Sequence, residues 1–161
     1  MGTRAFYDFV DDNPAVFMCP CEYCNKPSVI GQNENLVSIN SSVSVDLMGQ
    51  AASESIGVRQ FSGIGGQVDF IRGAALSPGG RAILAFPSTA GKKGEISRIV
   101  PQLTLGTPVT TGRNEIDYVV TEYGVAYLKF KSLRERALAL INIAHPDFRP
   151  ELRESLKKMN W

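Results

Sequence analysis

The chain has 161 residues, of which 43% are hydrophobic and 20% are charged. This length suits one well-packed core and is short for two domains of ordinary size, so we expect a single domain over residues 1–161. The 17 Lys and Arg residues nearly cancel the 16 Asp and Glu residues, and no basic block is present that could follow a phosphate backbone. Nucleic acid is therefore not an expected partner.

Membrane attachment is not expected either. No apolar run approaches the roughly 20 residues that span a bilayer. Residues 1–4 do not open a signal peptide, and Phe6 stands where a myristoylation motif needs Ser or Thr. The sequence predicts a cytoplasmic protein without a membrane partner.

The first third of the chain predicts a helix followed by short extended segments. Phe6, Phe9 and Val10 share one side of a helix over residues 4–12, which ends before Asn13-Pro14 and reads as the tail of a longer structure. The elements expected next are a strand over residues 15–19, a short helix over 27–32, and strands with period-2 alternation over 35–40 and 43–48.

Three cysteines, Cys19, Cys21 and Cys24, lie within six residues. A structural zinc site needs four ligands, and the fourth would have to be the lone His145 or a distant carboxylate. We therefore favour three reduced thiols at the end of a strand and in its following loop over a metal site, and no metal is expected. The sequence does not fix the role of these thiols.

A glycine-rich turn over residues 61–66 is the most distinctive local feature. Its three glycines, Gly63, Gly65 and Gly66, remove the Cβ atoms that block positive φ angles, so the backbone can turn sharply and direct N–H groups at a ligand. A helix is expected to follow, with Val68 and Leu76 on the same face as Ile71, and its N-terminus would favour an anion or an oxyanion. An ordinary tight turn remains the alternative.

The standard nucleotide motifs do not fit this turn. After Gly63 and Gly65, the third glycine of a dinucleotide loop would fall at Val68. A Walker loop needs Ser or Thr after Gly-Lys, but Gly91-Lys92 is followed by Lys93. The turn is therefore not a generic nucleotide-binding loop.

The rest of the chain predicts further strands and then two helices. Strands are expected over residues 81–86, 96–100, 108–110 and 118–121. Ser132 and Glu135 form a capping box at the start of a helix over residues 133–144, whose apolar stripe is 133, 137, 140, 141 and 144. A final helix over 148–159 should point Leu152 and Leu156 inward. The pattern indicates an α/β fold with a mixed sheet flanked by helices.

Several segments together resemble the acetyl-CoA hydrolase/transferase family, over its C-terminal half. They are Val37-Ser38-Ile39-Asn40-Ser41, Val45-Asp46-Leu47-Met48-Gly49-Gln50, the Gly63 to Phe70 loop, Ile96-Ser97-Arg98-Ile99-Val100-Pro101, Val119 to Ala126, and Ala144-His145-Pro146-Asp147-Phe148-Arg149. The resemblance runs from about Tyr7 to Leu152, and 4-hydroxybutyrate-type CoA-transferases look most similar among the family's transferases.

This resemblance implies the CoA-transferase, NagB/RpiA-like fold and a transfer of coenzyme A from an acyl-CoA to a short-chain carboxylate through a glutamyl-CoA thioester. In the family the nucleophilic glutamate lies in a Ser/Thr-Glu motif followed by Asp-Gly, upstream of the matching segments. Glu54, in Ser53-Glu54-Ser55, lacks that setting. The resemblance therefore implies no nucleophile within this chain, and as partners the N-terminal half of the same enzyme and, for the complete enzyme, a homo-oligomer.

The resemblance also implies contacts with CoA, as a substrate. Ser62 and Gly66 would line the CoA and its thioester, with backbone N–H groups of the loop near the carbonyl oxygen. The implied CoA-binding residues are Val43, Ser62, Gly63, Gly65, Gly66, Gln67 and Lys92. Lys93 is the substitute if the alignment is wrong by one residue, and Asn25 resembles an asparagine near the family's catalytic glutamate.

Two further residues have structural readings that we prefer. His145 is expected to cap the preceding helix by donating to its carbonyls, and Glu122 is expected to make a buried hydrogen bond to a neighbouring loop rather than to face a substrate. The alternatives to a transferase domain are an acetyl-CoA hydrolase domain and a stand-alone module that binds CoA or pairs with a separate subunit.

Overall fold

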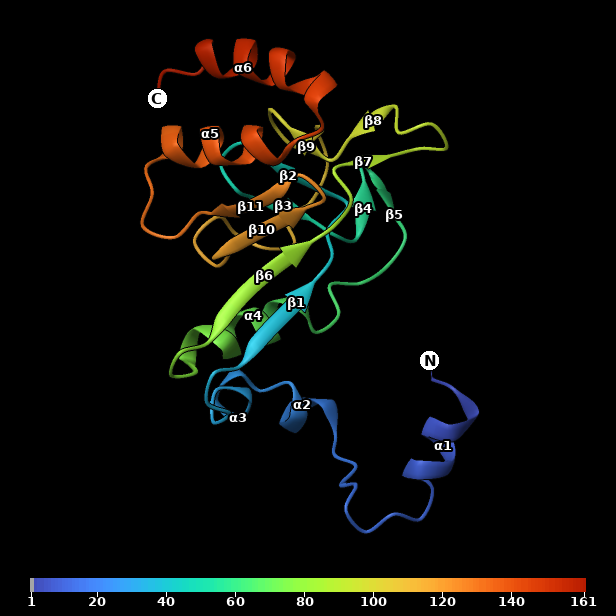
Figure 1. The fold of residues 1–161 in the computed structure, drawn as a ribbon. Helices are drawn as coiled ribbons and strands as arrows, with labels where there is room; N and C mark the ends of the chain where they lie inside the picture. Colours follow the sequence, from blue (N-terminus) through green and yellow to red (C-terminus); the bar gives the residue numbers. More distant parts are fainter. Residues whose placement is uncertain (1) are drawn as a thin grey trace.

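Four strands form the main sheet of the computed structural model, which describes residues 2–161 (Figure 1). Their order is β1 (Val37–Asn40), β6 (Arg81–Ala85), β10 (Tyr118–Thr121) and β11 (Gly124–Tyr127). The first three strands are parallel, whereas β11 is antiparallel to β10, so the sheet is mixed. The α/β class expected from the sequence is confirmed.

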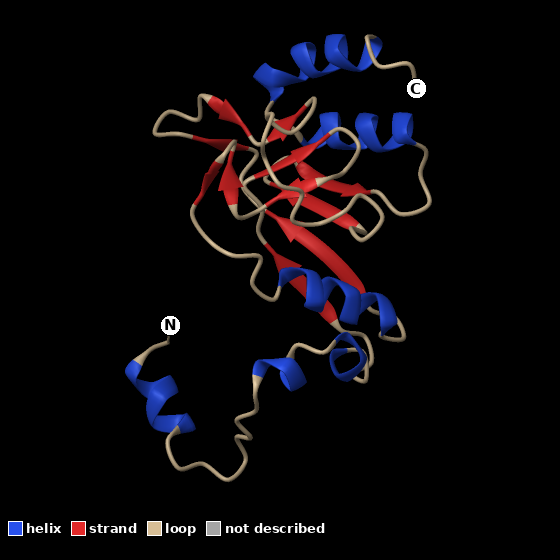
Figure 2. Ribbon diagram, turned by 180° about the vertical axis from the view of Figure 1, so that it is seen from behind, coloured by secondary structure: helices blue, strands red, loops and turns tan. Residues whose placement is uncertain are grey.

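Two helices bury one face of this sheet. Helix α4 (Gln67–Leu76) packs on β1 and β6, and helix α5 (Leu133–Ile143) packs on β11 and β10, as Figures 1 and 2 show from opposite sides. The strand residues beneath them are Ser38, Ala82, Leu84, Val119 and Ala126, all buried. Helix α6 (Arg149–Lys157) then packs on α5 through Leu152 and Leu156, as predicted.

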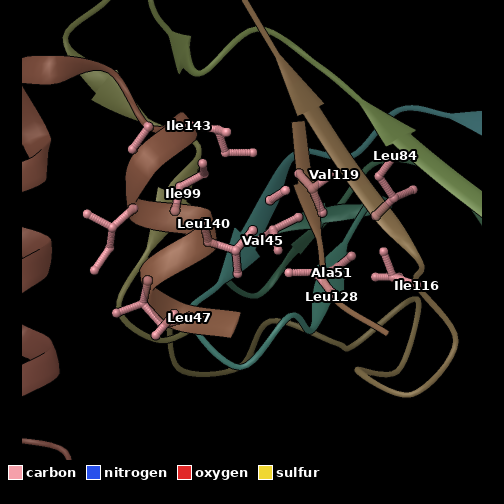
Figure 3. Packing of buried hydrophobic residues seen from close by; sticks show 14 of the residues in the cluster. Val45, Leu47, Ala51, Leu84, Ile99, Ile116, Val119, Leu128, Leu140 and Ile143 are labelled. Carbon is pink, nitrogen blue, oxygen red and sulfur yellow. The ribbon is translucent and has the colours of Figure 1, made fainter. Parts of the chain in front are cut away.

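Short strands build the second part of the fold. A three-stranded sheet has the order β3 (Ala51–Ala52), β2 (Ser44–Asp46) and β9 (Ile99–Val100). Two hairpins form separate two-stranded sheets: β4 (Ser55–Ile56) with β5 (Arg59–Gln60), and β7 (Thr89–Ala90) with β8 (Ile96–Ser97). Buried side chains of the three-stranded sheet, including Val45, Ala51 and Ile99, lie in the same core cluster as Leu84, Val119 and Leu140 (Figure 3).

The predicted helix starts are confirmed where local chemistry defines them. The Ser132 hydroxyl accepts a hydrogen bond from Glu135 N at 3.3 Å, and the Glu135 carboxylate accepts one from Ser132 N at 2.8 Å, which completes the capping box. The helix over 27–32 is α3 (Pro27–Ile30), with proline in its first turn. A 3₁₀ turn, η1 (Pro146–Phe148), precedes α6.

Three local predictions are wrong. Residues 15–19 are not a strand, because no other strand lies beside them to accept their hydrogen bonds. Residues 108–110 are not a strand either: Pro108 has no N–H to donate, and the neighbouring Thr111 forms an isolated bridge with Ala51. Leu76, expected on the same face of α4 as Ile71, is 62% exposed at the end of the helix, while Ile71 is buried.

The N-terminal arm, residues 2–18, lies apart from the rest of the molecule (Figures 1 and 2). It contains the predicted helix, α1 (Arg4–Val10), and the hydrogen bonds of residues 2–18 all stay within the arm. Phe6, Phe9 and Phe17 are 54%, 62% and 86% exposed. The arm's aromatic side chains therefore contribute nothing to the core.

Within residues 2–161, none of the helices is both long enough and apolar enough to cross a bilayer.

Candidate functional site

The glycine-rich turn links β5 to the N-terminus of α4. Its first residues are held by the Glu54 carbonyl, which accepts hydrogen bonds from Phe61 N at 3.0 Å and Ser62 N at 3.3 Å. Gly65 then adopts a φ of +61°, a conformation that costs glycine little, and Gly66 occupies the N-cap position of α4. The sharp turn into a helix that the sequence predicts is confirmed.

The turn leaves a row of backbone donors free. Among the hydrogen bonds of residues 2–161, none uses the N–H of Gly63, Gly65 or Gly66, and the loop from Phe61 to Gly65 is exposed. No side chain caps α4, so the orphan N–H groups of its first turn open on the same place. Free amides and the positive end of a ten-residue helix favour a negatively charged or polarised oxygen.

Asn25 brings a side chain to this point from another element. It ends helix α2 (Cys21–Cys24), and its Nδ2 lies 2.8 Å from the place that a Cβ on Gly66 would occupy. Glycine at position 66 therefore makes room for the Asn25 amide. The structure thus brings together Asn25 and Gly66, which the sequence separates by helix α3 and strands β1 to β5.

Gln67 is placed differently from the glycines. Its side chain is buried and donates from Nε2 to Thr111 Oγ1 at 3.0 Å. This hydrogen bond fixes the start of α4 against residue 111. Only the backbone of Gln67 is available at the exposed turn.

A cavity of about 270 Å³ lies beside the β4–β5 hairpin. Its walls come from the start of β2, the β4–β5 turn, the β7–β8 hairpin and the loop after β9. The lining residues are Val43, Ser44, Ser55, Ile56, Gly57, Ala90, Ile96, Ser97, Arg98, Val100, Thr104 and Thr107. Val43 is the only predicted CoA-binding residue among them, and its N–H already donates to Ala52 O at 2.8 Å. A backbone contact from Val43 would therefore use its carbonyl oxygen.

Three buried polar atoms in the cavity wall have no hydrogen-bond partner within residues 2–161: Ser55 Oγ, Arg98 Nε and Thr107 Oγ1. A buried polar group without a partner costs about 1–3 kcal/mol, so such atoms suit a ligand or water that completes them. Sequence reasoning missed all three, because they come from separate two-residue strands and loops that carry no motif of their own. The rest of the lining combines apolar side chains with Ser44, Ser97 and Thr104.

Lys92 and Lys93 lie at the tip of the β7–β8 hairpin, whose base contributes Ala90 and Ile96 to the cavity. Both lysines are exposed, and neither has an ion-pair partner within 4 Å in the described chain. The turn is fixed by Glu95, whose carboxylate accepts from Lys93 N at 2.9 Å. Backbone hydrogen bonds from its own N–H and from Lys93 N lower the pKa of Glu95. The hairpin thus presents two free ammonium groups.

Glu122 makes the hydrogen bonds to a neighbouring loop that the sequence predicted, although its side chain is not buried. Ser88 Oγ and Ser88 N donate to the two carboxylate oxygens at 2.6 and 2.8 Å. Partial desolvation would raise the pKa of Glu122, but these hydrogen bonds outweigh it and the pKa is lowered. The carboxylate therefore fixes the loop after β6.

The prediction for His145 is wrong. Instead of donating to the carbonyls of α5, His145 Nδ1 accepts from Asp147 N at 3.3 Å and so caps the next turn, η1. The last carbonyls of α5 are used by other groups: Thr121 Oγ1 donates to Ile143 O at 2.6 Å, and Arg149 Nε to Ala144 O at 2.9 Å. Pro146 directs the chain away from α5, which leaves the imidazole beside the following turn.

The cysteines are free thiols, but Cys21 and Cys24 lie on α2 rather than in a loop after a strand. Pro20 starts this short helix, and no strand precedes it. Cys24 Sγ lies 3.6 Å from Cys19 O, and desolvation together with Cys24 raises the pKa of the Cys19 thiol. No group of three or more His, Cys, Asp or Glu side chains within residues 2–161 is placed to hold a metal ion.

Comparisons with known proteins identify the family of this chain. Residues 2–156 match the family described as acetyl-CoA hydrolase/transferase C-terminal domain. The chain is 65% identical over 158 residues to the 4-hydroxybutyrate coenzyme A transferase of Clostridium kluyveri, which covers 98% of this chain and 37% of that protein. The chain therefore spans little more than a third of the length of this relative.

Solved structures give the same result. RipA from Yersinia pestis superposes with a TM-score of 0.90 at 50% identity, over 99% of this chain and 36% of that one. A 4-hydroxybutyrate CoA-transferase from Porphyromonas gingivalis superposes with a TM-score of 0.80 at 54% identity, over 98% of this chain and 35% of that one. The chain belongs to the acetyl-CoA hydrolase/transferase family and corresponds to its C-terminal domain.

Proposed function

We propose that this chain is the CoA-holding domain of a CoA-transferase of the 4-hydroxybutyrate/acetate type, which moves CoA between an acyl-CoA and a short-chain carboxylate. The domain spans residues 1–161 and acts with the rest of a longer, homo-oligomeric enzyme of the cytoplasm. The proposal rests on the family and on the uncovered glycine turn at the start of α4.

The arrangement of the predicted contacts supports a path for CoA. The Glu54 carbonyl holds the glycine turn, and the next residue, Ser55, lines the cavity together with Val43. The hairpin that carries Lys92 forms another wall of the same cavity. The turn, the cavity and the lysines are thus linked through the β4–β5 and β7–β8 hairpins.

Each part of this path suits a part of CoA. The free N–H groups of Gly63, Gly65 and Gly66 would stabilise the negative charge that develops on the thioester carbonyl oxygen. The largely apolar cavity, with its unpartnered Ser55 and Arg98 donors, would hold the amide-containing pantetheine arm. The ammonium of Lys92 would lie near the phosphates, where a cation is favoured.

The nucleophile is proposed to come from the polypeptide that precedes this domain. A glutamate there would attack the thioester carbonyl to give an acyl-glutamyl anhydride and release the CoA thiolate. The thiolate would then attack the glutamyl carbonyl, forming the glutamyl-CoA thioester and releasing the carboxylate; the acceptor acid reverses both steps. Asn25, next to Gly66, would orient the glutamate carboxyl.

The test compares the chain of residues 1–161 with the full-length gene product. We expect the isolated chain to show neither transfer nor hydrolysis of acyl-CoA, and the full-length protein to transfer CoA to acetate. Transfer by the isolated chain would overturn the proposal. Release of free CoA without any acceptor acid would identify the full-length protein as an acetyl-CoA hydrolase instead.

The lysine contact has its own test, a Lys92→Ala substitution in the full-length protein. Loss of one exposed cation near a phosphate is worth roughly 1 kcal/mol, so Kd for CoA should rise about fivefold. Binding of pantetheine, which lacks the nucleotide phosphates, should not change. Lys158→Ala at the end of α6 is the matched control. An equal loss of CoA affinity in both variants would mean that the effect comes from the net charge and not from a contact made by Lys92.

A further inference from the structure

The main sheet has a second face that no helix of the described chain covers. In Figure 1 this face of β1 and β6 is turned toward the viewer, with α4 behind it, and in Figure 2 α4 lies in front. The side chains on it alternate with the buried ones beneath α4 and α5. They include Val37, Ile39, Ile83, Tyr118, Val120 and Val125, which we call the open sheet face.

The strand register makes this face continuous. Ile39 pairs with Ile83, Ile83 with Tyr118, and Tyr118 with Tyr127, so one apolar row crosses all four strands. Val120 pairs with Val125 in the next row. A shallow hollow of about 260 Å³ on this face is lined by Ile83, Tyr118, Val120 and Val125, and by Arg81, the one charged residue among them.

The exposure of this face is unusual for its type of sheet. Ile39 is 65% exposed, Val125 62% and Val37 46%. Strands that run parallel, as β1, β6 and β10 do, are ordinarily covered on both faces, and a contiguous apolar patch is where another protein layer packs. The pattern is that of an α/β sheet with one of its two outer layers missing.

We propose that the open sheet face is covered by the polypeptide that precedes this domain in the longer enzyme, which packs an apolar layer on it. This rests on the proposed function in one respect, the existence of that longer enzyme. The support is length and order: the chain matches a C-terminal domain, and it covers 37% of the relative from Clostridium kluyveri, so most of such a protein precedes it.

The proposal gives the open sheet face a part in assembling the site. Strands β1 and β6 are the ones that α4 packs against, and the free N–H groups at Gly63 to Gly66 lead into α4. A layer on the opposite face of the same strands would bring the preceding polypeptide to the domain without covering the glycine turn.

Thiol labelling tests the docking without any use of CoA. Ile39→Cys and Val125→Cys, each in a background with Cys19, Cys21 and Cys24 changed to Ser, are treated with iodoacetamide in the isolated chain and in the full-length gene product. Labelling is followed by peptide mass spectrometry. Leu105→Cys is the control, because Leu105 is 95% exposed in a loop away from the sheet. Cooperative melting of each variant verifies that it is folded.

We expect both sheet positions to label at least about tenfold more slowly in the full-length protein, because a covered thiol reacts only when the interface opens. The Leu105→Cys rate should be the same in both proteins. Equal rates at the sheet positions would overturn the proposal. Slow labelling already present in the isolated chain would also overturn it. If that protection is independent of protein concentration, the N-terminal arm covers the face. If it occurs only at high concentration, a second copy of the chain covers it. A protein that protects this face but fails to transfer CoA would contradict the proposed function alone.

Discussion

The glycines of the turn differ in what each one makes possible. Gly65 supplies a positive φ, Gly66 leaves room for the Asn25 amide, and a Cβ on Gly63 would meet nothing within 4 Å. Two of the three are therefore required by the backbone or by a neighbour. The third, Gly63, is required by no contact within the chain, so a side chain there would affect only a ligand or another polypeptide that binds at the turn.

A Gly66→Ala substitution tests this division. The new methyl would push Asn25 away from the start of α4, and we expect kcat of the full-length protein to fall at least about tenfold, because displacement of a positioning group has a cost of that order. The free energy of unfolding measured in urea should change by less than about 1 kcal/mol, since the Asn25 side chain can rotate away from the new methyl. Gly63→Ala, which meets no atom, is the stability control.

Thr111 is the buried partner of Gln67, so Thr111→Val leaves the Gln67 amide without its acceptor. The expected loss is about 1–3 kcal/mol in the free energy of unfolding, measured in urea. Thr111→Ser keeps the hydroxyl and should recover most of that loss. If Ser and Val variants were equally destabilised, the hydrogen bond would not be the cause.

Glu122 gives a prediction for pH. Its pKa is lower in the folded chain than the ordinary value of about 4.3 in the unfolded one, so its stabilising contribution is complete above that value. The contribution is lost as the pH falls through the folded pKa. We expect the free energy of unfolding to fall less steeply for Glu122→Gln than for the parent between about pH 5 and pH 3, the range in which carboxyl groups titrate. A parallel curve would contradict the assignment.

Prediction of single residues succeeded where the type of a residue determines the local backbone structure. The glycine turn and the capping box of Ser132 and Glu135 follow from local backbone chemistry. The cavity atoms Ser55, Arg98 and Thr107 could not be predicted, because their meeting depends on the tertiary packing of hairpins. His145 was mistaken because Pro146 turns the chain, a consequence that the helix pattern does not contain.

Elements of several residues with a clear period were predictable, whereas two-residue strands were not. Helix α5 and strand β10 lie where the sequence placed them. Strands β3, β4 and β5 have too few residues to show a period, and they exist only through their partners. The apolar residues 15–19 have the composition of a strand but no neighbour to pair with.

Helix α5 connects the sheet to α6, and its buried side is the part that matters. Leu140 is fully buried, so Leu140→Ala should cost about 2–5 kcal/mol of unfolding free energy. Leu138, on the same helix, is 37% exposed, and Leu138→Ala should cost less than about 1 kcal/mol. Chemical denaturation of the pair measures the difference. Similar losses would contradict the packing described for α5.

Across the whole molecule, three surfaces of residues 2–161 have no partner within the described chain. They are the aromatic arm of residues 2–18, the open sheet face and the glycine turn at α4. Each would be explained if, as we propose, the domain is the C-terminal part of a longer enzyme; the chain covers 37% of its relative from Clostridium kluyveri. The sequence predicted that relation through scattered family segments, but it could not predict the open face, which depends on strand register.

The central claim is that this domain holds CoA while the preceding polypeptide supplies the nucleophile. The most direct measurement is peptide mapping by mass spectrometry of the full-length gene product after incubation with acyl-CoA and no acceptor. We predict a covalent CoA adduct on a glutamate of the polypeptide that precedes this domain. An adduct on any residue from 2 to 161, such as Glu54 or Glu122, would contradict it.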